Sequence, residues 1–448
     1  MNWEQLLNAQ RKPEKKNSPK DPVRSPFETD YDRIIFSYPF RRLQDKTQVH
    51  PLPVDDFVHT RLSHSLEVSS VGRSLGKIVG QTLLNRHTAL KESFDFHDFG
   101  AIVAAASLAH DIGNPPFGHS GEQAISDFFI FNEIGKNSIE TLNDAQKLDL
   151  QKFEGNAQGF RILTSNLYSG LQLTYATLAA FTKYPLSSNY KKDKTRKSHK
   201  KFGYFQAEAS NFSEIASTLG LTENQNGLGA WSRHPLAFLV EAADDICYSI
   251  IDLEDGCRLG HISYDETEEL LKPIIGVKFN KEKLHSYVNI NERVGVMRAL
   301  AINTLISECS QCFLDHENEL LNGSFDKALT DCIPSTPYLE TISKVSFEKI
   351  YKAKKVIDTE IVGFQVIPGI LEEIVPAVLG HSNPDIAVSG KQKLIIHQLP
   401  TEITLRLERG PLTLYEKLLI CTDFISGLTD SSALNIYRNL KGIELPKG

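Results

Sequence analysis

Cysteine is scarce in this chain, with six residues scattered among 448. So few thiols exclude the small disulfide-stapled scaffolds of secreted proteins and are typical of a reducing cytoplasm. An excess of positive charge is also missing, because 49 Lys and Arg face 56 Asp and Glu, for a formal net charge of −7. This balance argues against a general nucleic-acid coat protein. It is compatible with a phosphate-bearing small substrate, since local cations or a metal ion hold such a ligand.

Long apolar runs are a third absence. We find no stretch of the ~20 apolar residues that a membrane span needs. The N-terminal segment MNWEQLLNAQRKPEKK has no apolar stretch after its charges, so it does not read as a secretory signal. We therefore expect a cytoplasmic protein with no membrane contact. Hydrophobic residues make up 41% of the chain, which is enough for a sizeable core.

The apolar residues that are present recur mostly with helical spacing. Their periodicity predicts an amphipathic helix over 60–85. The Ala-rich apolar segment 99–111 predicts a buried helix, a new helix is expected to start near Ser120 with Glu122 in its first turn, and the apolar segment 235–257, with Pro at its start, predicts another. Further helices are expected over 291–321, 364–379 and 411–440. Strand-like alternation is scarce, and 393–407 is the best candidate for a short hairpin or strand. The fold class expected is mainly α.

The chain divides by composition into three parts. Residues 1–30 are polar, with four prolines among Lys and Asp, and predict an extended or mobile arm. A multi-helix core is expected over 31–270, with a basic loop at 189–201, and a helical region over 271–448. The basic loop carries seven Lys or Arg against one Asp between Tyr190 and Lys201. Most such runs are solvated loops, but this one could also be a cationic lip beside a polyphosphate site.

His110 and Asp111 end the buried Ala-rich helix, where Gly113-Asn114-Pro115-Pro116 must break it. A buried His beside a charged Asp is costly unless something satisfies both, and a divalent metal ion would. His64 lies on the helix upstream. Asp244 and Asp245 are adjacent carboxylates on an otherwise apolar helix face, which repel each other without a cation or hydrogen bonds. Each could also be an ordinary buried His or capping Asp. Together, these imidazoles and carboxylates suit Mn²⁺, Fe²⁺, Co²⁺ or Zn²⁺, and Mg²⁺ less well.

His119 and Glu122 form a second pair, one helical turn apart and therefore able to touch. A His oriented by a carboxylate is the arrangement of a general acid or base. Glu122 could instead be a favourable first-turn residue of the new helix. The pair Cys309 and Cys312 suggests redox chemistry or half a zinc site, but without a second pair in a helical stretch we interpret it as structural.

Several blocks of this sequence resemble the deoxyguanosine triphosphate triphosphohydrolases of the HD superfamily. They cover nearly the whole chain after the arm, and the block around His110 is the most specific. The blocks are FRRLQDKTQV (40–49), RLSHSLEV (61–68), LAHDIGNPPFGHSGE (108–122), FEGNAQGFRIL (153–163), KFGYF (201–205), HPLAFLVEAADDICYSIIDLEDG (234–256), KVIDTEIVGFQVIPGIL (355–371) and ICTDFISGLTDSSALNIYRNL (420–440).

The resemblance implies an HD-domain fold and roles for individual residues. His64, His110, Asp111 and Asp244 would bind the metal ion, with Asp245 as the alternative to Asp244. Asp244 is favoured because the family's substrate-contacting Tyr and Asp, four and eight residues further on, then fall on Tyr248 and Asp252. His119 and Glu122 would be the catalytic pair. Asn114 stands where the family has a second His, and we expect it to touch no ligand. The remaining substrate-binding positions are Gln48 at the deoxyribose, Arg61 at a phosphate, and Asn156, Lys183, Tyr184 and Lys201 near the triphosphate.

The activity expected from this resemblance is metal-dependent hydrolysis of deoxynucleoside triphosphates to deoxynucleoside and inorganic triphosphate. The base preference is left open. The family also implies a homo-oligomer, often a hexamer, and allosteric activation by a dNTP in some members. Two alternatives stay open: an HD phosphohydrolase of another nucleotide, and a nucleotide-sensing protein that binds single-stranded DNA through the basic loop.

Overall fold

The computed structural model describes residues 1–12, 23–48, 59–165, 171–191, 193, 195–223, 229–381 and 387–443. Parts of the expected arm (13–22), two lysines of the basic loop (192 and 194) and the last five residues of the C-terminal region lie outside these ranges. The described residues form helices joined by loops, and only isolated β-bridges occur among them. The mainly α prediction is confirmed.

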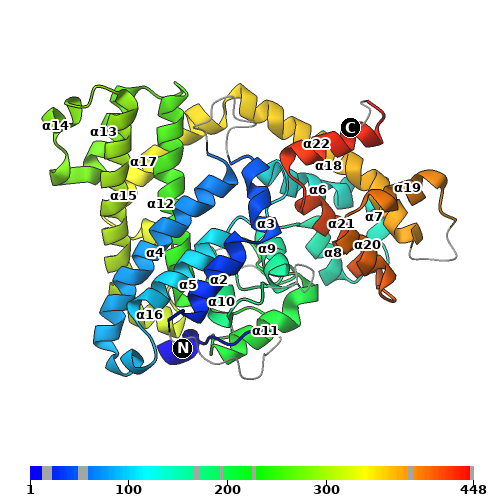
Figure 1. Cartoon of the computed structure of the whole chain (residues 1–448), viewed down its shortest axis with the longest axis horizontal. Coiled ribbons are helices and arrows are strands. Elements are labelled where there is room, and N and C mark those ends of the chain that lie inside the picture. The colour runs from blue at the N-terminus through cyan, green and yellow to red at the C-terminus, as the bar shows by residue number, and fades with distance from the viewer. Residues whose placement is uncertain are drawn as a thin grey trace.

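Most helices of the N-terminal two thirds pack around a core built on α4 and α5, whereas α6, α7 and α8 lie on the other side of the molecule (Figure 1). Their bounds are α1 Trp3–Leu6, α2 Pro26–Ile35, α3 Tyr38–Arg41, α4 Arg61–Arg86, α5 Phe96–Ala109, α6 Gly118–Phe131, α7 Glu133–Ile139, α8 Asp144–Gln151, α9 Gly155–Thr164, α10 Tyr175–Phe181, α11 Ala209–Thr218, α12 Pro235–Arg258, α13 Tyr264–Ile275, α14 Lys281–His285, α15 Ile290–Asp315 and α16 Glu317–Asn322. The helices predicted over 60–85, 99–111 and 235–257 correspond to α4, α5 and α12 within a few residues.

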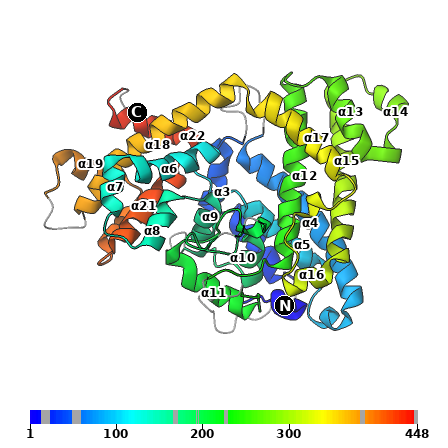
Figure 2. The same ribbon diagram turned by 180° about the vertical axis from the view of Figure 1, so that it is seen from behind.

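Of the remaining helices, α18 to α22 build a second core together with α6, α7 and α8, whereas α17 packs in the first core. Their bounds are α17 Thr336–Ser346, α18 Lys354–His381, α19 Gly390–Gln398, α20 Thr401–Glu408, α21 Leu414–Ser426 and α22 Asp430–Leu440. The long helix α18 crosses the molecule from α17 to the C-terminal helices, as the view from behind shows (Figure 2).

The strand expected over 393–407 is wrong, because this segment forms α19 and α20. Ile395 and Ile396 are buried there, and the buried positions continue with Leu399, Ile403 and Leu407. Their steps of three and four match the turn of a helix and not the alternation of a strand. Ser389 starts α19 with a capping box to Gln392, which further favours a helix.

The first twelve residues also differ from the arm that their polar composition suggests. Trp3, Leu6 and Leu7 are buried in the main core, and the Trp3 indole N–H donates to Glu317 at 3.0 Å. Three large apolar side chains in a short segment are enough to fasten it, even among polar neighbours.

One helix corrects the expectation about apolar runs. Val356–His381 of α18 is long and apolar enough to cross a membrane, with a mean hydropathy of 1.6. Of its most apolar window, 56% is buried inside the protein, against α6, α21 and α22 among other helices. A core helix of a globular protein passes the same test of length and composition.

Glycines on α4 allow α5 to pack unusually close. A Cβ atom at Gly76 would lie 2.6 Å from the backbone oxygen of Phe99, and one at Gly80 would lie 2.8 Å from the Phe99 ring. The close approach sets the distance between the histidine near the start of α4 and the histidine at the end of α5, His64 and His110.

We expect Gly76→Ala to lower the free energy of unfolding by about 1–3 kcal/mol, because the methyl group must push two helix backbones apart. Gly295→Ala is the matched control, since a Cβ there meets nothing within 4 Å. That helical substitution should raise stability by about 0.5–1 kcal/mol. Urea unfolding of both variants measures the contrast, and equal effects would contradict the close-packing argument.

Candidate active site

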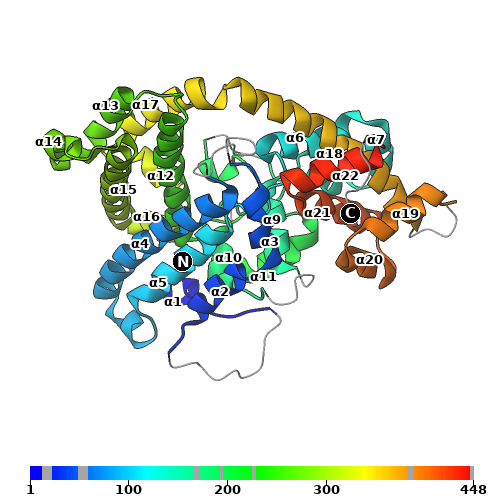
Figure 3. The same cartoon turned by 45° about the horizontal axis from the view of Figure 1, so that its top comes forward.

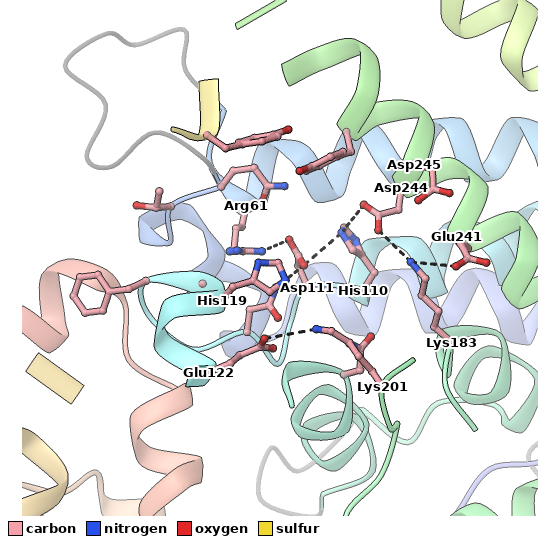
Figure 4. Close-up of a pocket in the computed structure, with 18 of the residues that line it drawn as sticks. Arg61, His110, Asp111, His119, Glu122, Lys183, Lys201, Glu241, Asp244 and Asp245 are labelled. Atoms are coloured by element: carbon pink, nitrogen blue, oxygen red, sulfur yellow. Dashed lines mark hydrogen bonds and ion pairs between the residues drawn. The ribbon is translucent and has the colours of Figure 1, made fainter. Parts of the chain in front are cut away.

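Three side chains from three helices converge on one point. They are His64 on α4, His110 at the end of α5 and Asp244 on α12, and Figure 4 labels the last two. The Nε2 atom of His64 lies 3.3 Å from Oδ1 of Asp244, and Nε2 of His110 lies 3.6 Å from the same oxygen. All three ligand atoms lie within 4.8 Å of one another.

This spacing suits a divalent ion. Bonds of about 2.1 Å to a single ion would separate its ligand atoms by roughly 3.0–3.4 Å. The ring of His110 is oriented for this role, because Nδ1 is 2.7 Å from the carbonyl oxygen of Ser107. A proton on Nδ1 would donate to that carbonyl and leave the lone pair of Nε2 facing the other two ligands. The residues present therefore fit the metal ion that their chemistry implies.

The charge on Asp244 is strongly favoured by its neighbours. Burial opposes ionisation, but His110, His64 and Lys183 outweigh it and hold the pKa of Asp244 far below its ordinary value. Asp245 differs: it accepts a hydrogen bond from Thr330 at 2.7 Å, and burial raises its pKa to about 6. Asp245 is outside the three-atom group, so the geometry favours Asp244.

Asp111 lies beside the group and not within it. Its Oδ1 is 3.6 Å from Nε2 of His110, while Arg61 donates to its Oδ2 at 2.6 Å. Burial opposes ionisation here too, but Arg61 and the two histidines lower the pKa of Asp111 to about 2. Asn114 donates to Oδ1 at 2.5 Å. The expectation that Asn114 touches no proposed ligand is therefore wrong.

His119 and Glu122 both lie on the first turns of α6, beside Asp111 (Figure 4). Burial lowers the pKa of His119, and the cations of Lys201 and Arg61 lower it further. The oxygens of Glu122 are engaged by other groups: the backbone N–H of Gly155 donates to Oε1 at 2.7 Å, and Lys201 lies 3.6 Å from Oε2. Among the described contacts, Glu122 thus acts on Lys201 and α9, and no hydrogen bond or ion pair joins it to His119.

A cavity of about 580 Å³ opens beside these groups, where the two cores meet. Cationic side chains line one part of it: Arg61, Lys183, Lys200 and Lys201. Lys183 stays charged, because Glu241 at 3.6 Å and Asp244 at 3.8 Å raise its pKa against the effect of burial. Tyr184 and Asn156 also line the cavity, and the amide of Asn156 donates to Glu154 at 2.8 Å.

Aromatic residues line another part of the cavity. The rings of Tyr248 and Tyr351 are stacked with centroids 5.6 Å apart, and the Tyr351 hydroxyl donates to Asp252 at 2.5 Å. Asp252 itself is behind this pair and is not among the lining residues. Gln48 lines the cavity, and its buried Oε1 has no hydrogen-bond partner among the described residues.

Residues 61–165 match the sequence profile of the HD domain. A Synechocystis protein named deoxyguanosinetriphosphate triphosphohydrolase-like is 42% identical over 455 positions, which cover 99% of this chain and all of the relative. A Pseudomonas aeruginosa protein of the same name is 39% identical over the whole of both chains. The chain belongs to the deoxyguanosinetriphosphate triphosphohydrolase family. A Salmonella paratyphi A member named deoxyguanosinetriphosphate triphosphohydrolase is 30% identical over 93% of this chain and 94% of its own length.

Membership of the triphosphohydrolase family makes the protein a phosphohydrolase. HD domains bind divalent metals, and His64, His110 and Asp244 are the group in this member that could hold one.

In this family member, one part of the basic loop lies away from the cavity and another part forms a cationic edge of it. Arg196 pairs with Asp326 at 2.6 Å and Lys197 with Asp331 at 2.7 Å, both in the helical region that follows α16. Lys200 and Lys201 line the cavity. Among the described residues of the loop, Lys200 and Lys201 at its end are thus the ones that contribute cations to the site.

Sequence reasoning missed several residues that line the cavity of this triphosphohydrolase family member. Phe347 and Tyr351 come from a π-helical turn before α18, and Val356, Thr359 and Glu360 from the first turns of α18. The block over 355–371 resembles the family, so it could have directed attention to α18. No local pattern marks Tyr351, because its role depends on stacking against a residue about a hundred positions earlier.

Proposed function

We propose that this protein is a metal-dependent dNTP triphosphohydrolase. It cleaves the bond between the 5′-oxygen of a deoxynucleoside and the α-phosphorus, so that the products are the deoxynucleoside and inorganic triphosphate. The observation that carries the proposal is the placement of the His64–His110–Asp244 group beside a cavity lined by both cationic side chains and stacked aromatic rings. Together with Asp111, this group would hold Mn²⁺, Fe²⁺, Co²⁺ or Mg²⁺, with Zn²⁺ also compatible with the ligands.

The cationic part of the cavity suits a triphosphate. Arg61 can present its guanidinium to phosphate oxygens, Lys183 and Lys201 supply two point charges, and Tyr184 and Asn156 add polar groups nearby. A bound divalent ion would neutralise charge on the α-phosphate and lower the pKa of a coordinated water. The cations of the chain then act mainly on the β- and γ-phosphates.

His119 is suited to accept a proton. Its lowered pKa means that the neutral imidazole predominates at neutral pH, so the ring can take the proton of an attacking water. Lys201 lies 3.6 Å from Glu122 and 2.8 Å from Glu154, and its positive charge lowers the pKa of His119 more than the negative charge of Glu154 raises it. After attack, the same ring can return its proton to the departing 5′-oxygen.

The aromatic part of the cavity suits the nucleoside. The stacked Tyr248 and Tyr351 offer a flat apolar surface for a sugar or base. Asp252 fixes Tyr351 through a hydrogen bond. Gln48 brings an unpaired amide oxygen to the cavity, where it would contact the deoxyribose and exclude a 2′-hydroxyl.

Product analysis tests the proposal directly. The purified protein is incubated with Mn²⁺ and each dNTP and NTP, singly and in mixtures, and the products are separated by ion-exchange chromatography. Deoxynucleoside and triphosphate are the expected products, with activation in mixtures if a dNTP also serves as an effector. A nucleoside monophosphate with pyrophosphate, or hydrolysis of other nucleotides only, would contradict the proposal.

The resemblance alone supports four further parts of the proposal. They are a homo-oligomer such as a hexamer, a regulatory dNTP, single-stranded DNA as a partner, and a cytoplasmic location. Sedimentation with and without dNTPs tests the first two, and binding of single-stranded DNA at several salt concentrations tests the third. All six cysteines are free thiols, which is compatible with the location.

A further inference from the structure

A single buried carboxylate joins two separate segments of the active site. Asp430 begins α22 and is only 5% exposed. The backbone N–H of Thr47 donates to its Oδ2 at 3.0 Å, and the backbone N–H of Phe117 donates to its Oδ1 at 3.0 Å. Both donors are more than three hundred residues away in sequence. The C-terminal helices thus reach the N-terminal half of the chain here (Figure 3).

Each of the two segments carries a side chain of the proposed site. Thr47 directly precedes Gln48, which lines the cavity. Phe117 lies two residues before His119 and has the left-handed backbone angle φ of 63°. Such a conformation is unfavourable for a bulky L-residue and persists only where surrounding contacts fix it. The hydrogen bond from the backbone N–H of Phe117 to Asp430 is one of those contacts. It fixes the backbone position at which α6 begins and, with it, the position of His119.

Further hydrogen bonds near Asp430 connect the same parts of the chain. Lys46 is buried and donates to the carbonyl oxygen of Asn114 at 2.6 Å and to that of Ser426 at 2.7 Å. It therefore ties the turn after Asp111 to the end of α21. Asp45 accepts a hydrogen bond from Ser431 at 3.0 Å. The connection between α21–α22 and the site is thus built from several contacts, with Asp430 holding both segments at once.

The position of Asp430 in the first turn of α22 does not account for these bonds. Thr429 already caps that helix, since its side-chain oxygen accepts from the backbone N–H of Ser432 at 3.2 Å. The two oxygens of Asp430 accept instead from segments outside the helix. Only an ionised carboxylate offers two acceptor oxygens without a competing donor, so an amide of the same shape could satisfy one of the two N–H groups at most.

We propose that Asp430 is a positioning residue that holds Gln48 and His119 in register across the cavity. Through Thr47 it fixes the end of the site that would exclude a 2′-hydroxyl, and through Phe117 it fixes the proton acceptor. The roles of Gln48 and His119 in this inference rest on the proposed function. We call the two hydrogen bonds from the backbone N–H groups of Thr47 and Phe117 to Asp430 the clamp, and its existence does not depend on the proposed function.

Three variants test the clamp: Asp430→Asn, Asp430→Ala and, as the matched control, Thr429→Ala, which weakens the start of α22 without touching either segment. For Asp430→Asn we expect kcat with dNTPs to fall by about tenfold or more, because small displacements of reacting groups are costly. The preference for dNTPs over NTPs should fall with it. Affinity for Mn²⁺ by titration calorimetry should stay within threefold, since no metal ligand moves. Thr429→Ala should lower Tm while keeping kcat and the dNTP preference.

Hydrogen exchange separates failure of the clamp from failure of the proposed function. The amides of Thr47 and Phe117 should exchange faster in Asp430→Asn than in wild type and Thr429→Ala, whatever the substrate proves to be. Unchanged exchange at both amides, or a kcat equal to that of Thr429→Ala, would overturn the inference. If Asp430→Ala does not fold, Asp430→Asn still decides, because it keeps the shape of the side chain. A wild-type protein inactive on every dNTP would refute the proposed function and leave the exchange result standing.

Discussion

Replacing Asp244 with asparagine is expected to abolish divalent-metal binding and hydrolysis together. The change removes the anionic oxygen that lies within 3.6 Å of both histidine Nε2 atoms. It also removes the negative charge that holds two buried imidazoles and Lys183 together. Loss of a direct ligand should cost more than the 10–100-fold in affinity typical of outer-shell changes, so we expect a drop above roughly 100-fold. Titration calorimetry with Mn²⁺ and turnover at saturating Mn²⁺ measure the two effects.

Asp245→Asn is the control, because it makes the same chemical change one residue along the same helix. Asp245 accepts from Thr330 and is outside the three-atom group. We expect its variant to bind Mn²⁺ within a few-fold of wild type. If Asp245→Asn lost the metal and Asp244→Asn kept it, the ligand assignment would be reversed.

Replacing His119 with alanine is expected to lower kcat by about 10²–10⁴-fold while metal affinity stays within a few-fold of wild type. The imidazole lies in the cavity beside Asp111 but outside the metal-fitting group, so its loss removes a proton acceptor and spares the ligands. Single-turnover rates and Mn²⁺ titration together separate the two functions. His97→Ala on the exposed start of α5 should leave both values unchanged. A rate for His119→Ala within a few-fold of wild type would refute the role.

The pH profile gives a second readout for His119. Burial, Lys201 and Arg61 lower the pKa of this ring, so it is protonated only below the ordinary histidine range of about 6.5. Protonation removes the acceptor, and kcat of the wild type should therefore fall on the acidic side below that range. His119→Ala should lose this acidic limb from its residual activity.

Much of the fold follows from local patterns. Composition and apolar spacing predict α4, α5 and α12 closely, since each carries buried apolar residues along many turns. The error at 393–407 has a physical cause: α19 and α20 are short, and neither covers enough turns for a period to dominate. The prediction of an arm differs from the structure at residues 1–12 for another reason. A few buried side chains decide the placement of this segment, although its average composition is polar.

The candidate site was accessible to sequence reasoning where residue type carries the chemistry and where the family resemblance points to lining residues such as Gln48 and Tyr248. His64, His110 and Asp244 belong to the residue classes that bind metals, and the fold brings them together. The role of Asp111 does not follow from its residue type alone. Arg61 and Asn114 donate hydrogen bonds to its two oxygens, which are the atoms that would bind a metal ion. The contacts of Tyr351 and Asp430 join residues 99 and 383 positions apart, which no local spacing encodes.

The tight contact between α4 and α5 should determine which ionic radius the proposed metal site accepts. Gly76 and Gly80 leave those helices no room to move closer, and the shared apolar core resists separation. The gap between the two imidazoles is consequently a fixed dimension of the scaffold. Ions that need bonds of about 2.3–2.6 Å and six to eight oxygen donors, as Ca²⁺ does, are mismatched to both its width and its nitrogen content. Calcium should therefore compete poorly with smaller transition-metal ions, and the backbone spacing of two helices, more than any single side chain, would enforce that discrimination.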